Sequence, residues 1–194
     1  MNKILILMIV IIFIKDSLNE EIKAFCKLIQ SQNSGVSGVI NFSQKSNLDN
    51  VKINGEIENL LAIHAFHIHE FPMKGNNCTS AGFHFNPTNS THGGPGKESL
   101  FKHLGDLGNI KSKGRKTSFS MTSEDISLFG ENSILNKTCI IHEGEDDLGL
   151  GELNSKIDGN SGNRISCGII YRSSSIFFNP LTILNLILLI SLII

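Results

Sequence analysis

The middle of the chain alternates short apolar runs with polar, turn-rich segments, and both ends are long apolar runs. Seven runs in the middle are rich in β-branched residues or alternate between apolar and polar positions, which predicts β-strands. They span 24–30, 38–43, 51–58, 62–70, 117–122, 138–142 and 164–171. Small polar residues at 33–35, 54–55, 108–109 and 158–160 predict turns. No segment between the ends has a convincing helical period, so the pattern predicts an all-β antiparallel sandwich or barrel.

Two long stretches, residues 71–108 and 143–163, interrupt this rhythm. Loops of that length inside a small domain are usually functional or held down by other contacts. Most of the histidine and cysteine residues fall in or beside the two stretches. We therefore expect the chemistry of the protein there.

Residues 1–18 have the pattern of a secretory signal peptide. Lys3 supplies a positive start, an apolar run covers 4–14, and Lys15 and Asp16 end it. A buried strand or helix is the alternative, but the run is too short to span a bilayer. We place the cleavage site between Ser17 and Asn19.

Residues 176–194 carry no charge and follow three serines at 173–175. Small residues before a terminal apolar segment are typical of a GPI-attachment signal. A tail-anchoring helix and a buried terminal strand are the alternatives. Either anchor would place the intervening domain, residues 19–175, on a membrane and outside the cytosol.

The whole chain has 194 residues and a formal net charge of −1. Without Lys3, Lys15 and Asp16, the domain has 17 − 2 = 15 basic and 18 − 1 = 17 acidic residues, a net charge of −2. This balance excludes a general nucleic-acid-binding protein, which would show a basic excess. Secretion agrees with four N-x-Ser/Thr glycosylation motifs, which begin at Asn41, Asn77, Asn89 and Asn136.

The histidines form a candidate metal-binding set. His67 and His69 lie on a predicted strand and share one face, because side chains alternate across a strand. His64 has the opposite parity, so we expect a hydrogen-bonded structural role for it. Downstream, the first long stretch and its exit supply three more histidines and a carboxylate, a natural tetrahedral set for zinc: His84, His92, His103 and Asp106. Exposed loop histidines are the alternative.

His142 is the last residue of another predicted strand, 138–142, and could complete a copper site with His67, His69 and His84. Imidazole suits both copper and zinc. If His84 uses both ring nitrogens, it can bridge the two metals. Asp146 could then accept N–H groups from ligand imidazoles and fix their orientation.

Six sequence blocks carry a resemblance to a known family. They are FHIHEF (66–71), CTSAGFHFNP (78–87), HGGP (92–95), HLGDLGN (103–109), HE…DDLG (142–149) and GNSGNRISCG (159–168). In this order they resemble copper/zinc superoxide dismutase over residues 24–171. The resemblance implies a flattened, eight-stranded Greek-key β-barrel. It also implies one copper and one zinc, and dismutation of superoxide to dioxygen and hydrogen peroxide.

The resemblance also implies residue roles. Copper is expected on His67, His69, His84 and His142, and zinc on His84, His92, His103 and Asp106. His84 and Arg164 are the expected catalytic residues, with Arg164 binding the anion beside copper. A disulfide is expected between Cys78 and Cys167. Cys26 and Cys139 remain as two buried free thiols, with a second disulfide as the alternative.

Three departures from the family pattern stand out: a small insertion between His92 and His103, Pro72 after Phe71, and Tyr171-Arg172 at the end of the last predicted strand. The last two put the family homodimer in doubt, so a homodimer is left open. Lys156, with Glu145 and Glu152, is a candidate for steering superoxide electrostatically, and a plain surface lysine is the alternative. The alternatives to an active dismutase are an inactive metal-binding relative and an adhesion module.

Overall fold

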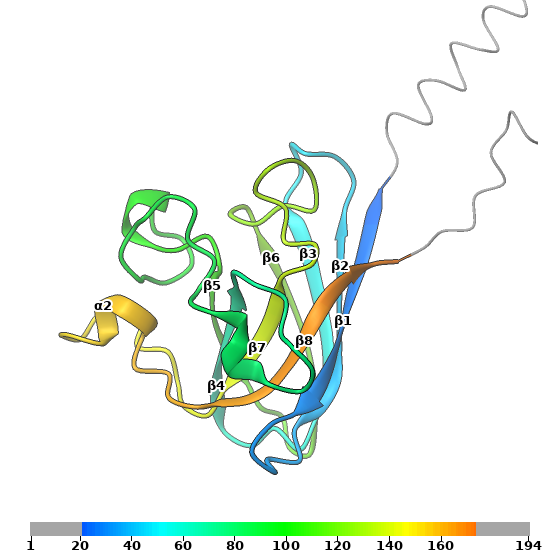
Figure 1. Cartoon of the computed structure of the whole chain (residues 1–194), viewed down its shortest axis with the longest axis vertical. Helices are drawn as coiled ribbons and strands as arrows, with labels where there is room; N and C mark the ends of the chain where they lie inside the picture. The colour runs from blue at the N-terminus through cyan, green and yellow to red at the C-terminus, as the bar shows by residue number, and fades with distance from the viewer. Residues whose placement is uncertain (1–20, 174–194) are drawn as a thin grey trace, which may run out of the picture. The chain divides into compact units, whose positions relative to one another are not determined.

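The computed structural model describes residues 21–173, and the predicted signal peptide (1–18) and the predicted tail (176–194) lie outside them. Eight antiparallel strands form one sheet in the order β5-β4-β7-β8-β1-β2-β3-β6, which curls into a nearly closed barrel (Figure 1). The strands are β1 (Ile22–Gln30), β2 (Ser37–Gln44), β3 (Val51–Glu58), β4 (Ile63–His69), β5 (Asp106–Lys111), β6 (Lys116–Ser123), β7 (Thr138–His142) and β8 (Arg164–Arg172). The predicted eight-stranded all-β barrel is confirmed.

Strict alternation of apolar and polar residues builds the barrel wall. In β3, Val51, Ile53 and Ile57 are fully buried, while Lys52, Asn54 and Glu56 between them are exposed. β1 follows the same pattern, with Ala24, Cys26 and Leu28 facing the core. By contrast, all but the first residue of β4 are buried, as are all residues of β7. Side chains on the outer face of these two strands are therefore covered by something other than the core.

Two predicted turns are wrong. Asn54 and Gly55 lie inside β3 and pair with both β2 and β6; Gly55 is needed because the Phe119 ring occupies the place of a side chain. Gly108 and Asn109 lie inside β5, a strand that the sequence pattern does not predict. This strand contains a positive φ of 77° at Gly108. Glycine adopts such angles readily, so the local sequence has the composition of a turn.

The outer face of β4 and β7 is covered by the two long loops. The first joins β4 to β5 and contains two 3₁₀ turns, η1 (Cys78–Ala81) and η2 (Ser99–Phe101). The second joins β7 to β8 and contains the one-turn helix α2 (Ser155–Asp158). The loops meet where the His92 N–H donates to the Lys156 carbonyl (2.9 Å). The predicted loop positions are thus confirmed, except that the first ends where β5 begins.

The predicted disulfide is present and holds the first loop to the barrel. Cys78 in η1 is bonded to Cys167 in β8, with their Cα atoms 5.7 Å apart. An ion pair also links the same loop to the β6–β7 connection: the fully buried Lys102 ammonium lies 2.5 Å from Asp125 Oδ2. Among residues 21–173, no helix has the length and apolar character needed to cross a bilayer.

Candidate metal centre

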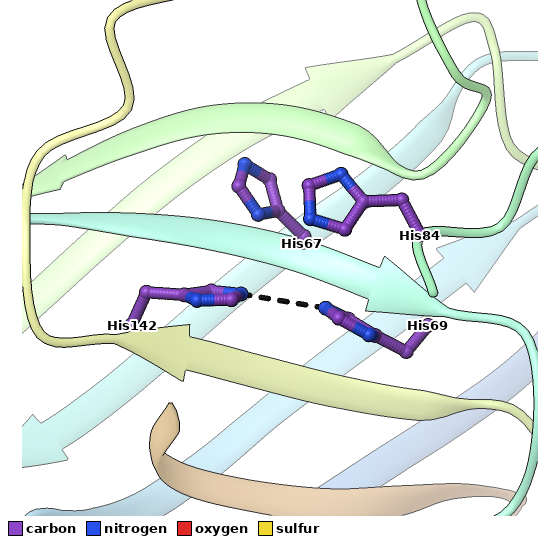
Figure 2. Close-up of side chains that lie close together, drawn as sticks. All are labelled: His67, His69, His84 and His142. Carbon is purple, nitrogen blue, oxygen red and sulfur yellow. Dashed lines mark hydrogen bonds between the residues drawn. The ribbon is translucent and has the colours of Figure 1, made fainter. Parts of the chain in front are cut away.

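Four histidines from three elements converge on the outside of the barrel. His67 and His69 project from β4, His142 from the end of β7, and His84 from the first long loop (Figure 2). Their rings point toward a common centre, and Nε2 of His69 lies 3.3 Å from Nε2 of His142. One ring nitrogen from each histidine fits within a group whose atoms all lie within 4.8 Å of one another. The predicted copper set is therefore assembled.

The second predicted set lies next to the first and shares His84. Nδ1 of His84 lies 2.8 Å and Nδ1 of His103 lies 3.1 Å from Asp106 Oδ1, and the two nitrogens are 3.4 Å apart. Nδ1 of His92 lies 3.1 Å from Asp106 Oδ2. Three imidazoles and one carboxylate at these separations are a typical donor set for a tetrahedral zinc ion.

The polar atoms that lack partners test whether these sets suit metal ions. Among the described residues, the buried side-chain nitrogens without a hydrogen bond of good geometry are His67 Nδ1, His84 Nε2 and His92 Nδ1, of which His92 Nδ1 has only its 3.1 Å contact with Asp106. An unpaired buried polar atom costs about 1–3 kcal/mol, so such atoms are rare unless they have another ligand. All three nitrogens belong to the two sets, and both ring nitrogens of His84 face a set. The residues present therefore fit a copper ion in one set and a zinc ion in the other, with His84 common to both sets.

The nitrogens that face away from the proposed ions are held by hydrogen bonds. Asp146 contacts two of them, with Oδ2 2.9 Å from Nε2 of His67 and Oδ1 2.8 Å from Nε2 of His92. Nδ1 of His69 lies 3.0 Å from the Gly82 carbonyl, and Nδ1 of His142 lies 3.1 Å from the Gly162 carbonyl. Bonds of this kind fix the ring orientation and leave the opposite nitrogen free for a metal.

Asn109 is a residue of the site that sequence reasoning missed. Its side-chain amide donates to the Asp146 carbonyl and its side-chain carbonyl accepts from the Asp146 N–H, each at 2.8 Å. The β5 strand thereby holds the second long loop and sets the position of Asp146. No local pattern signals this role, because Gly108 and Asn109 have the composition of a turn.

The protonation states of the imidazoles suit metal binding. Burial, and repulsion from neighbouring histidines, lower the pKa of His67 and His69 well below 6.5, and burial lowers that of His84. Burial followed by the charge of His84 lowers the pKa of His142 to about 3. These histidines are neutral at pH 7, which is the form that binds metals.

Around the carboxylates Asp106 and Asp146, the pKa of a histidine is raised instead of lowered. Burial lowers the pKa of His92, but Asp106 and Asp146 outweigh it through hydrogen bonds and charge, and the pKa is raised to about 9. Burial also opposes ionisation of Asp106, yet hydrogen bonds from His103, His84 and His92 hold its pKa well below the usual range. Asp106 is thus an anionic ligand, and a cation bound beside it would replace the proton on His92.

Arg164 begins β8 and lies at the copper side of the centre. Its guanidinium donates to three carbonyls of the η1 segment: Cys78 at 2.8 Å, Thr79 at 3.1 Å and Gly82 at 2.5 Å. Its charge also contributes to the lowered pKa values of His69 and His142. Arg164 is partly buried, so a fixed positive charge stands at the edge of the copper set.

The proposed steering residues are all in the second long loop. The Lys156 ammonium donates to the Gly149 carbonyl, and Lys156 lines a pocket with the zinc-side residue His92 and with Lys97. Glu145 and Glu152 are exposed. Lys156 therefore lies beside the zinc set.

The remaining histidine and cysteines are structural, as expected. Nδ1 of His64 lies 2.9 Å from the His142 carbonyl, and its Nε2 contacts the Leu61 carbonyl. Cys26 and Cys139 are buried free thiols. Burial, and the neighbouring Cys26, raise the pKa of the Cys139 thiol well above its ordinary value.

The fold and the site define a β-barrel metalloprotein with one copper set and one zinc set. The family model described as Copper/zinc superoxide dismutase (SODC) matches residues 36–170. The chain therefore belongs to the copper/zinc superoxide dismutase family, whose members are enzymes that dismutate superoxide.

Curated relatives agree with this assignment. Superoxide dismutase (Cu-Zn) 5 of Dictyostelium discoideum is 49% identical over 139 residues, which cover 70% of this chain and 90% of the relative. Superoxide dismutase (Cu-Zn) A of Xenopus laevis is 44% identical over 151 residues, which cover 77% of this chain and 97% of the relative. The copper and zinc predicted from the sequence are thus supported by both the family and the donor sets.

Proposed function

We propose that the chain dismutates superoxide at this centre, with copper on His67, His69, His84 and His142 and zinc on His84, His92, His103 and Asp106. The observation that carries the proposal is the sharing of His84, whose two ring nitrogens face the two sets. Bound copper would supply the one-electron chemistry of dismutation, in which one superoxide is oxidised to dioxygen and another takes up that electron and two protons to become hydrogen peroxide.

The residues of the chain have three further roles in this proposal. Arg164 binds and orients the anion, because a guanidinium keeps its charge at any physiological pH. When Nε2 of His84 is not bound to copper, it would hold a proton and deliver it to the departing anion, while Asp106 and the zinc set keep the ring in place. Asp146 positions the rings of His67 and His92, and so acts on both sets through hydrogen bonds.

Two reciprocal variants test the assignment of the two sets. In the full chain, His142→Ala should lose copper and activity but keep zinc, because His142 belongs to the copper set alone. His92→Ala should lower zinc affinity and leave the copper ligands in place. Metal content and superoxide removal are measured on both proteins. Full activity in His142→Ala, or zinc as the sole bound metal in the unmodified chain, would refute the proposal.

The cellular setting is a separate proposal, and it rests on the sequence. We infer that residues 1–18 direct secretion and that residues 176–194 attach the enzyme to the cell surface for extracellular antioxidant defence. The Cys78–Cys167 disulfide suits an oxidising compartment. Asn41, Asn77, Asn89 and Asn136 are all exposed on the folded domain, as glycan attachment requires.

Treatment of intact cells with a phosphoinositide-cleaving lipase tests the type of attachment. A GPI anchor predicts release of the enzyme into the medium, whereas a protein helix predicts retention. A glycosidase that removes N-glycans should lower the apparent mass of the secreted protein. A cytosolic protein with the apolar ends still attached would contradict the proposed location.

A homodimer is typical of the family, and we leave this oligomeric state open for the chain. Phe25 on β1 and Tyr171 on β8 form an exposed pair of aromatic rings with centroids 6.2 Å apart, and Tyr171 is one of the departures from the family pattern. Sedimentation of the purified enzyme tests this, and a monomer at all concentrations would contradict it.

A further inference from the structure

Met73 makes an unusual contact with the disulfide. Its Sδ atom lies 3.2 Å from Sγ of Cys167, and its side chain packs against the small buried cluster formed by Cys78, Ala81, Ile140 and Cys167. Met73 is partly exposed, whereas the two bonded cysteines are buried, with Cys167 at 0% and Cys78 at 2% exposure. The thioether therefore covers the disulfide and is itself within reach of small solutes.

The segment 78–82, which begins at the disulfide, holds the proposed anion-binding residue Arg164 in place. The carbonyls of Cys78, Thr79 and Gly82 accept hydrogen bonds from Arg164. The Gly82 carbonyl also lies 3.0 Å from Nδ1 of the copper-set residue His69. Any change that loosens the disulfide segment would move these carbonyls and, with them, Arg164.

Sulfur atoms in the described part of the chain differ in their access to peroxide. Cys26 and Cys139 are fully buried, and Cys78 and Cys167 are already oxidised to a disulfide. The thioethers in this part are those of Met73 and Met121, and both are partly buried. Met121 lies on β6, where it packs against the barrel core. A thioether can be oxidised without prior deprotonation, unlike a thiol.

We propose that Met73 is an oxidation site through which the hydrogen peroxide made by the enzyme loosens the disulfide segment. The thioether sulfur attacks one peroxide oxygen, the O–O bond breaks, and the sulfur keeps that oxygen as a sulfoxide. The other oxygen leaves as water with both peroxide protons. Sulfur is oxidised by two electrons and the peroxide is reduced by two, so the step needs only the product of the family reaction.

The sulfoxide would leave the apolar cluster. Oxidation turns a flexible apolar side chain into a polar one, and a polar oxygen without a partner is unfavourable among Cys78, Ala81 and Ile140. Met73 would rotate into water and uncover the disulfide. We expect a thiol reductant then to cleave the Cys78–Cys167 bond about tenfold faster.

The experiment uses the full, metal-loaded chain treated with graded hydrogen peroxide. Peptide mapping by mass spectrometry locates added oxygen, and a mild thiol reductant then measures the rate of disulfide cleavage. We expect Met73 to gain oxygen at doses that leave Met121 unmodified, and cleavage to accelerate with the extent of that oxidation. Equal or earlier oxidation of Met121 would overturn the proposal.

Two substitutions separate Met73 from other peroxide damage. Met73→Leu keeps an apolar side chain of similar volume, so peroxide should no longer accelerate disulfide cleavage. Met73→Gln imitates the polar product and should accelerate cleavage without peroxide, while Met121→Leu should behave like the unmodified chain. If peroxide accelerates cleavage equally in Met73→Leu, Met73 is not the site.

Discussion

Asp146 is the residue whose replacement tests the arrangement of the centre most directly. Its two carboxylate oxygens hold one imidazole from each set, Nε2 of His67 at 2.9 Å and Nε2 of His92 at 2.8 Å. Asp146→Asn keeps the size of the side chain but offers a single oxygen. One ring must then face the amide NH2, where two donors meet and no hydrogen bond forms.

The expected loss follows from the bond that is removed. A hydrogen bond to a charged group contributes about 1.5–3 kcal/mol, and loss of a partner that orients a ligand lowers metal affinity about 10–100-fold. We therefore expect Asp146→Asn to bind at least one of the two metals about 10–100-fold more weakly. The metal with the larger loss identifies the imidazole that faces the amide nitrogen.

Competition with a chelator, followed by metal analysis, measures both affinities. Asp147→Asn is the matched control, because Asp147 lies in the same loop but bonds Gly149, Ser155 and Asn160 and contacts no imidazole. The reasoning is refuted if Asp146→Asn keeps both metals with unchanged affinity. It is also refuted if Asp147→Asn loses them to the same extent, since loop disorder would then explain the loss.

The strands and the two ligand sets could be predicted from the sequence, for different physical reasons. Alternation is a local property, so β1 and β3 could be placed from their apolar positions alone. The ligands were found because histidine and aspartate have few other uses at such density, and because the H-x-H spacing puts His67 and His69 on one face.

Strand β5 and the hydrogen bonds that hold Asp146 in the metal centre could not be predicted from the sequence in this way. From its sequence, β5 resembles a turn because it contains Gly108 and Asn109, and Gly108 does adopt a positive φ. The strand is stabilised by its pairing with β4, which is distant in the sequence. Asn109 acquires its role through two bonds to Asp146, which lies 37 positions away. Contacts of this kind depend on the closed barrel and leave no local pattern.

Three further outcomes follow from charge and chain topology. Arg164→Lys should lower superoxide turnover while both metals stay bound, because an ammonium lacks the planar fork that bonds the η1 carbonyls; unchanged steady-state kinetics would contradict this. Replacing Cys78 and Cys167 by serine should lower the free energy of unfolding by roughly 2–5 kcal/mol, and an unchanged urea midpoint would contradict the proposed tie. The metal-free chain should lose stability as the pH falls from about 6.5 to 5. His142 has its pKa lowered to about 3 in the folded state, so below about 6.5 the unfolded chain takes up a proton that the folded chain does not. Over 1.5 pH units this histidine alone should cost about 2 kcal/mol. The raised pKa of His92, about 9, adds no slope there, because both states are protonated below about 6.5 and its contribution is lost only as the pH rises through 9. Urea unfolding of the chelated protein at both pH values measures the difference, and equal or greater stability at pH 5 would refute the buried, neutral state of the copper-side histidines.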